Sequence, residues 1–355
     1  MARSGKGRYK IPMRKLCLGL LLVACASESG ARAPATGGVA GSAPDASADA
    51  QSDAAGGGAG TGGTSGAAGS AGTAGLAACP EFEAGVVAGT VASPAITEAS
   101  GIVASQKNPG VLYVHNDSGD GPRIFAVGLD GKHLGELTLS GATAQDWEDI
   151  ALGPGPTAGE SYLYAGDIGD NSSARANIKI FRVPEPVIDA KGAAVDQSLS
   201  GVETFTVTYA DGAHNAEALL VDPKAGQLVI VTKAASGVSQ VFQSAGLLAA
   251  GGGNVTLTEA NSVTFGQGAL GGSTLVTGGD VSPAGDRIAI RTYSGVFLWR
   301  RSPGESLAQA FSSEPCPALA LPEKQGEAVG FAADGSGYYT VSEGKAPPLH
   351  WFAQK

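Results

Sequence analysis

The feature that most constrains the fold of this chain is a repeat. An acidic residue followed by a short run of small or apolar residues occurs five times, at intervals of 50, 69, 63 and 47 residues. Further apolar runs follow each start and are separated by turns rich in Gly, Pro, Asn and Asp. Short strands grouped in fours at a period of about 50 residues are typical of β-propeller blades. The five starts are Glu98 in EASGIVA, Glu148 in EDIALGP, Glu217 in EALLVDP, Asp280 in DVSPAGD and Glu327 in EAVGFAADG.

The repeat predicts an all-β fold, a single β-propeller over residues 79–355 with five four-stranded blades. Six blades would result if the long second or third interval holds extra strands. The last unit stops after three strands, and one unassigned strand, residues 84–92, precedes the first start. We expect that strand to complete the last blade and to cover its open edge. Another all-β stack and two separate β domains are the alternatives.

Residues 1–24 have the composition of a secretory signal peptide. Six basic side chains lie in the first fifteen residues, and the apolar run LCLGLLLVA after them is too short for a mature membrane span. The run ends in LVAC, which resembles the lipobox of bacterial lipoproteins and implies cleavage before Cys25 and lipid attachment to its thiol. Ala26, rather than Asp, after the lipidated Cys implies sorting to the outer membrane. The protein is then expected to be bound to that membrane through its N-terminal lipid. Ordinary secretion with an incidental Cys25 is the alternative.

Residues 25–78 consist mostly of Gly, Ala, Ser and Thr, which predicts a disordered, flexible tether. Beyond it the chain holds two cysteines, Cys79 and Cys316. In an oxidising compartment they are expected to form a disulfide, and two free buried thiols are the alternative. Loss of the six basic residues of the signal would change the net charge of −10 to −16. Such a negative chain is not expected to bind nucleic acid, and cations or neutral and basic ligands fit it better.

In a four-stranded blade, the start of the first strand lies beside the end of the second. We therefore expect residues from these two places, far apart in sequence, to meet at one rim of a central channel. Carboxylates gathered there must be protonated, paired or neutralised by a cation. Calcium or another divalent ion with oxygen ligands is the simplest neutraliser. The candidate metal ligands are Glu98, Asp117, Asp120, Glu148, Asp167, Asp170, Glu217, Asp280 and Glu327.

Two alternatives to a metal site remain open at this rim. The acidic side chains could be solvated turn residues, since Asp-Gly turns are common between strands. They could also form a salt-bridged ring with Lys233 and Arg291. These two basic residues, with Asn116 and Trp147, are the candidate ligand-binding residues, although core packing is the expected role of Trp147. The candidate catalytic residues are Glu148, Asp149, His115 and His214, and a hydrogen-bonded structural role is the expected one for each histidine.

The segments EASGI, NPGVLYVHNDSGD, DWEDIA and GDIGDN resemble a group of uncharacterised secreted bacterial proteins associated with propeller folds. More distantly, NPGVLYV and GLDGK are similar to calcium-dependent, phytase-like β-propellers. That resemblance implies carboxylates that hold cations, with Lys233 and Arg291 binding a phosphate.

The sequence therefore predicts a cell-envelope lipoprotein that binds a small-molecule or polymer ligand at an acidic, cation-binding rim. A calcium-dependent hydrolase of phosphoesters or lactones is the first rival, and a glycosidase with paired carboxylates is the second.

Overall fold

The computed structural model describes residues 78–266 and 272–355. The predicted signal peptide, Cys25 and the tether lie outside the described residues. Within them the chain is all-β, as predicted, and the one helix found is the single turn α1 (Leu307–Ala310). No helix of the described part is long and apolar enough to cross a membrane.

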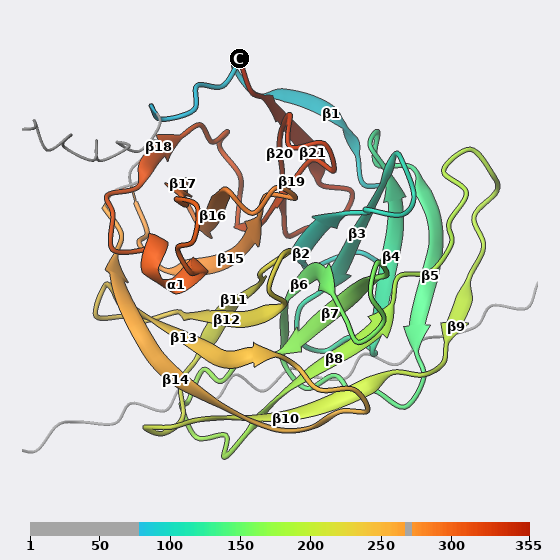
Figure 1. The fold of residues 1–355 in the computed structure, drawn as a ribbon. Helices are drawn as coiled ribbons and strands as arrows, with labels where there is room; N and C mark the ends of the chain where they lie inside the picture. Colours follow the sequence, from blue (N-terminus) through green and yellow to red (C-terminus); the bar gives the residue numbers. More distant parts are fainter. Residues whose placement is uncertain (1–77, 267–271) are drawn as a thin grey trace, which may run out of the picture. The chain divides into compact units, whose positions relative to one another are not determined.

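The strands form four hydrogen-bonded sheets (Figure 1). The first holds β2 to β5 in chain order, and a short strand, β9, joins its edge in parallel with β5. This extra strand comes from the long second interval of the repeat, so the interval supplies an edge strand to an earlier sheet. The strands of this sheet are β2 (Ala99–Ala104), β3 (Val111–Asn116), β4 (Arg123–Gly128), β5 (His133–Leu139) and β9 (Gln197–Leu199).

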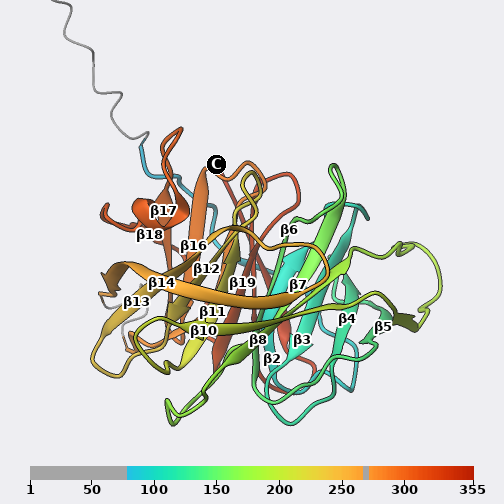
Figure 2. The ribbon, with the colours of Figure 1, turned by 60° about the horizontal axis from the view of Figure 1, so that its bottom comes forward.

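The second sheet has eight strands because two groups of four join at their outer edges. The outer strands β10 and β14 pair in parallel, from Phe205 opposite Gly253 to Tyr209 opposite Leu257. Figure 2 shows these two strands side by side. One group is β6 (Trp147–Pro154), β7 (Ser161–Asp167), β8 (Ile178–Pro184) and β10 (Glu203–Tyr209); the other is β11 (Ala216–Val221), β12 (Gln227–Thr232), β13 (Val238–Leu247) and β14 (Gly253–Thr264).

The two remaining sheets have four strands each. In the last one, the N-terminal strand β1 pairs antiparallel with the C-terminal strand β21, which confirms the predicted closing strand. One sheet is β15 (Val276–Val281), β16 (Arg287–Thr292), β17 (Gly295–Arg300) and β18 (Cys316–Ala318); the other is β19 (Gly326–Phe331), β20 (Gly337–Ser342), β21 (Pro348–Ala353) and β1 (Val86–Thr90).

The first strands of the five groups lie side by side in a cycle. Strand β2 contacts β6, β6 contacts β11, β11 contacts β15, β15 contacts β19, and β19 contacts β2 again. Figure 1 shows them at the centre, with the later strands of each group outside. Glycines allow this close approach: a Cβ on Gly330 would lie 2.5 Å from the carbonyl oxygen of Ile102, and one on Gly278 would lie 2.7 Å from that of Glu327. The ends of the first strands are thus brought together from distant parts of the sequence.

The burial patterns of the strands agree with these positions. The first strands β2, β11, β15 and β19 are buried along their whole length, as expected for strands covered on both faces. Strand β10, at the outside, alternates between buried and partly exposed residues. That alternation is the pattern of a strand with one face in the core.

The predicted disulfide between Cys79 and Cys316 is confirmed, with a Cα–Cα distance of 5.5 Å. Cys79 precedes the closing strand β1, and Cys316 begins β18 in the neighbouring sheet. The bond closes a loop with a sequence separation of 237 residues.

Because this loop is long, the Cys79→Ser substitution is expected to lower the free energy of unfolding by about 2–5 kcal/mol. Cys79 is the exposed partner, so the variant leaves the thiol of Cys316 buried without adding a buried hydroxyl. Denaturant unfolding of the oxidised wild type and the variant measures the difference. Equal midpoints would show that the bond does not hold the closing strand.

Candidate functional site

Each first strand has a β-bulge near its start. The strand pairing shifts by one residue at the second position of β2, β6, β11, β15 and β19. The five residues at these bulges are equivalent, and three of them are carboxylates from the predicted set. They are Ser100, Glu148, Glu217, Thr277 and Glu327.

The bulges correct two predicted placements. Glu98 lies two residues before the equivalent position of its strand, in the preceding loop, and is exposed. Asp280 is the fifth residue of β15, near the opposite end of the first strands, and is not at this rim. Both residues fit the acidic-start pattern, but the bulge positions in their strands hold Ser100 and Thr277.

The strongest candidate for a cation site is formed by Asp117, Asp146 and Glu148. One carboxylate oxygen from each lies within 4.8 Å of the others. Asp146 and Glu148 stand on either side of Trp147 at the start of β6. Asp117 follows β3, and its backbone N–H donates to the carbonyl oxygen of Glu98. This bond fixes Asp117 at the end of the first strands where the bulges lie, which we call the acidic mouth. We call these three residues the carboxylate triad.

Glu148 also connects the triad to the next strand. It hydrogen-bonds Glu217, and burial and the negative charge of Glu217 raise the pKa of Glu148 well above its usual range. Lys233 Nζ lies 2.9 Å from Glu217 Oε1 and 2.8 Å from the hydroxyl of Tyr293. Lys233 is thus at the predicted rim and neutralises Glu217.

Glu327 extends the acidic mouth on the side of β19. Burial and the charge of Glu217 raise its pKa to about 8, and it hydrogen-bonds Glu343 at the end of β20. Burial also raises the pKa of Asp117 and of Asp146, with repulsion from other carboxylates adding to the effect. The mouth therefore holds more negative charge than its own basic groups balance. An arrangement of this kind favours protons or a bound cation.

Three predicted metal ligands, and the predicted ligand-binding residue Asn116, instead hold loops. Asp167 accepts hydrogen bonds from the backbone N–H groups of Gln145 and Asp146 and pairs with Arg175 at 2.9 Å. Asn116, at the equivalent place after β3, accepts from the N–H groups of Thr97 and Glu98. Asp120 pairs with Arg123, and Asp170 accepts from the backbone N–H of Arg175. The oxygen atoms of these four side chains are engaged within the protein.

Three other candidates belong to the interior. Asp149 is buried and accepts from the N–H groups of Ile150, Leu219 and Gly279, so it links β6, β11 and β15. His115 is fully buried, which lowers its pKa to about 4, and its Nδ1 lies 2.7 Å from the carbonyl oxygen of Asn116. Trp147 packs against His115 and Phe181 and is 1% exposed, so it is core and not a pocket wall.

Arg291 does not face this mouth, contrary to prediction. Its side chain is fully buried, and it pairs at 2.8 Å with Glu323, which lies in the loop before β19. His214 does lie near the mouth, where its Nε2 is 3.0 Å from Asp211. With Lys233, it lines a pocket of about 390 Å³ that also includes Asn171, Asn215 and Gln240.

Sequence reasoning missed Asp146, Arg175 and Tyr293. Asp146 could have been found, because it shares the short segment DWED with Glu148 and Asp149. Tyr293 carries no local signal, since it reaches Lys233 only through the packing of β15 and β16 against β11 and β12. A comparison of the chain with protein-family models gave no match, and a search of curated proteins gave none.

Proposed function

We propose that this protein is a five-bladed β-propeller that binds a divalent cation at the carboxylate triad and, next to it, a polar extracytoplasmic ligand. The single observation that carries the proposal is the approach of the three carboxylate oxygens within 4.8 Å of one another. Glu148 is only 3% exposed, and a group so buried gains more from a cation than a solvated carboxylate would. The cycle of five first strands supports the blade number.

Calcium is the cation that this donor set fits best. It accepts six to eight oxygen ligands in flexible geometry, whereas magnesium requires a near-ideal octahedron. Asp117, Asp146 and Glu148 come from two loops and a bulge, and Glu217 is a further carboxylate within hydrogen-bond reach of Glu148. Among the described residues, no histidine or cysteine belongs to the group, which argues against a zinc-type site.

The pocket beside Lys233 is the proposed ligand site. Its lining offers amide groups from Asn171, Asn215 and Gln240, together with the ring of His214. Lys233 lines this pocket and pairs with Glu217, so a ligand there would be linked to the triad through that salt bridge and the contact between Glu217 and Glu148. A hydroxyl-rich ligand such as a saccharide, or a phosphate ester, suits these donors and acceptors.

Export with a lipid anchor at Cys25 completes the proposal. The disulfide supports an oxidising compartment, where such bonds form and persist. The acidic mouth supports the expectation that nucleic acid is not a partner, since its phosphates would be repelled.

The test is calcium binding measured by isothermal titration calorimetry on the full-length protein after chelation. The wild type is expected to bind about one calcium ion, and the Glu148→Gln and Asp146→Asn variants are expected to lose at least about tenfold in affinity. Glu259→Gln, an exposed change on the outer strand β14, is the matched control and should bind as the wild type does. Identical titrations for all four proteins would remove the cation from the site.

A calcium-dependent hydrolase of phosphoesters or lactones is the second candidate. It is favoured by the position of Lys233 between the carboxylates and the pocket, where it could bind an anionic group. Assays of aryl phosphates and lactones with and without calcium distinguish it from binding alone. A glycosidase is less well supported, because Glu148 and Glu217 share a hydrogen bond and so lie closer than the about 5 Å separation of retaining enzymes.

A further inference from the structure

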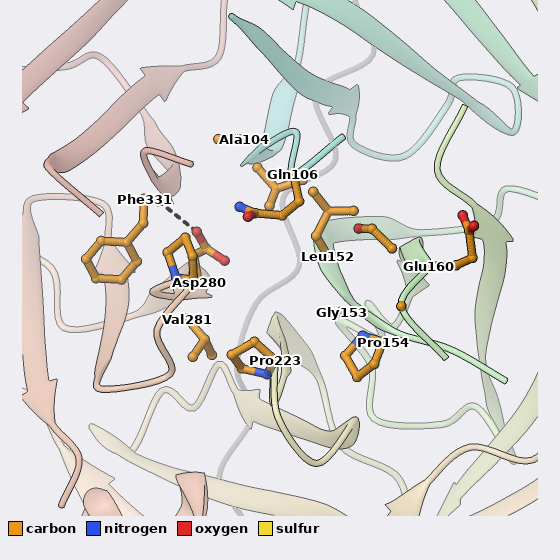
Figure 3. Close-up of a pocket in the computed structure, with 14 residues that line it drawn as sticks. Ala104, Gln106, Leu152, Gly153, Pro154, Glu160, Pro223, Asp280, Val281 and Phe331 are labelled. Atoms are coloured by element: carbon orange, nitrogen blue, oxygen red, sulfur yellow. Dashed lines mark hydrogen bonds between the residues drawn. The ribbon is translucent and has the colours of Figure 1, made fainter. Parts of the chain in front are cut away.

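A second pocket lies at the end of the first strands opposite the carboxylate triad (Figure 3). Its volume is about 350 Å³, and all five groups of strands contribute to it. The walls are formed by polar and apolar atoms in equal measure, and the apolar part includes Val103 from β2, Leu152 from β6, Val281 from β15 and Phe331 from β19. Pro223, which follows β11, closes the remaining side.

Asp280 lies in the wall of this pocket, next to Phe331. It is 6% exposed, and Oδ2 accepts a hydrogen bond of 2.7 Å from the backbone N–H of Phe331. Figure 3 shows the other carboxylate oxygen directed toward the middle of the pocket. Burial raises the pKa of Asp280 to about 7, and backbone hydrogen bonds from Phe331 and Val281 oppose that rise. The hydrogen bond from Phe331 thus uses one oxygen of this carboxylate, and the other oxygen is directed toward the pocket.

Among the five first strands, only β15 has a carboxylate at its fifth residue. The fifth residues of the other four first strands are Val103, Ala151, Leu220 and Gly330, all without polar side chains. A fold that needed only packing here would be served by an apolar residue, because a buried carboxylate without a partner costs free energy. The lining residues include no lysine, arginine or histidine that could pair with Asp280. The second acidic residue of the lining, Glu160, has its own basic partner, since its Oε2 lies 3.8 Å from Lys107 Nζ.

We propose that this pocket binds a small organic cation, with an ammonium group on the pocket-facing oxygen of Asp280 and an apolar body against Leu152, Val281 and Phe331. A carboxylate in a wall that also presents apolar side chains is complementary to a primary amine on an aromatic or aliphatic body. An anion would meet the carboxylate of Asp280, and a neutral alcohol would make a hydrogen bond without the charge. This site is separate from the carboxylate triad and does not depend on the cation proposed there.

Benzylamine, benzyl alcohol and benzoate are matched probes, because they share a ring and differ in charge. Binding is measured by ligand-detected NMR on the full-length protein at pH 8 with a chelator present, so that the carboxylate is ionised and the triad is free of metal. Benzylamine is expected to bind about tenfold or more tightly than benzyl alcohol, and benzoate is expected not to bind. Equal binding of the amine and the alcohol would overturn the proposal.

Asp280→Asn keeps an oxygen that can accept from Phe331 and removes the charge, so it should abolish the preference for the amine. Because a buried substitution can unfold the protein, Gln106 provides a second pair of variants. Its side chain is exposed, and Figure 3 shows its amide toward Asp280. Gln106→Arg would place a competing cation beside the carboxylate and weaken benzylamine binding, whereas Gln106→Glu would strengthen it. Unchanged affinity in both Gln106 variants and in a folded Asp280→Asn would refute the site.

Discussion

The chelated protein is expected to become more stable when the pH falls from 8 to 6, by on the order of 2 kcal/mol. The cause is burial of carboxyl groups: the pKa of Glu327 is raised to about 8 and that of Asp280 to about 7. A carboxyl with a raised folded-state pKa binds protons more tightly in the folded chain. Its contribution to stability is complete below the unfolded pKa and is lost as the pH rises through the folded pKa.

One buried group acts in the opposite direction. The pKa of His115 is lowered to about 4, so the unfolded chain takes up a proton on this residue before the folded chain does. That loss grows as the pH falls below about 6.5, the unfolded pKa of histidine, and at pH 6 it is below about 1 kcal/mol, less than the gain from the carboxyl groups. Carboxyl groups with lowered pKa values, such as Asp222 beside Arg301, lose their contribution only in more acidic solution. The window from pH 8 to pH 6 therefore isolates the raised carboxyls.

Urea unfolding at pH 6, 7 and 8 measures this dependence. Glu327→Gln is expected to reduce it, because the amide carries no charge at any of these pH values, while the exposed Glu259→Gln should keep it. Saturating calcium should also reduce the pH dependence of stability if the cation replaces protons at the acidic mouth. A stability that stayed constant or fell between pH 8 and pH 6 would contradict the buried, protonated state of these groups.

The second large effect is expected at Arg291, where the Arg291→Met substitution should cost about 3–5 kcal/mol. Arg291, from β16, and Glu323, from the loop before β19, pair at 2.8 Å with both side chains at most 1% exposed. Glu323 also accepts 2.6 Å and 2.7 Å hydrogen bonds from Thr340 and His350 on β20 and β21. Removing the guanidinium leaves a buried carboxylate without its cation between two sheets.

The double variant Arg291→Met with Glu323→Gln separates the charge effect from the packing effect. It removes both charges and keeps an amide oxygen for Thr340 and His350, so it should recover part of the loss. Thermal and urea unfolding of the two single variants and the double variant complete the cycle. Strictly additive losses would show that the pair is not coupled, and the network would then not be what joins these sheets.

The sequence predicted the all-β fold, the closing strand and the disulfide because each depends on a local pattern. Apolar runs bounded by turns are visible residue by residue, and the unmatched strand at residues 84–92 had one open edge to fill. Cys79 and Cys316 were the only cysteines left after the N-terminal segment. None of these inferences needed the register of one strand against another.

The site was predicted less well because it depends on register. The bulge position holds Glu148, Glu217 and Glu327 in three strands, but Ser100 and Thr277 in the others. Glu98 and Asp280 have the same chemistry at neighbouring positions, and a displacement of two or three residues moves a side chain into a loop or to the other end of the strand. The direction of Arg291 was equally hidden, because it is set by Glu323, which lies in the loop before β19 of a different sheet.

The bond between Cys79 and Cys316 also determines where a mechanical load would enter the folded domain. A pull on the chain from the side of residue 78 would reach Cys79 first and pass through the sulfur atoms into β18, at its first residue. Strand β1 begins only at Val86, so its hydrogen bonds to β21 would carry no tension while the bridge is intact. Reduction would move the force first onto the hydrogen bonds that join Glu81 to Lys355 and Glu83 to Ala353, and then onto β1, which could be peeled from its partner one bond at a time.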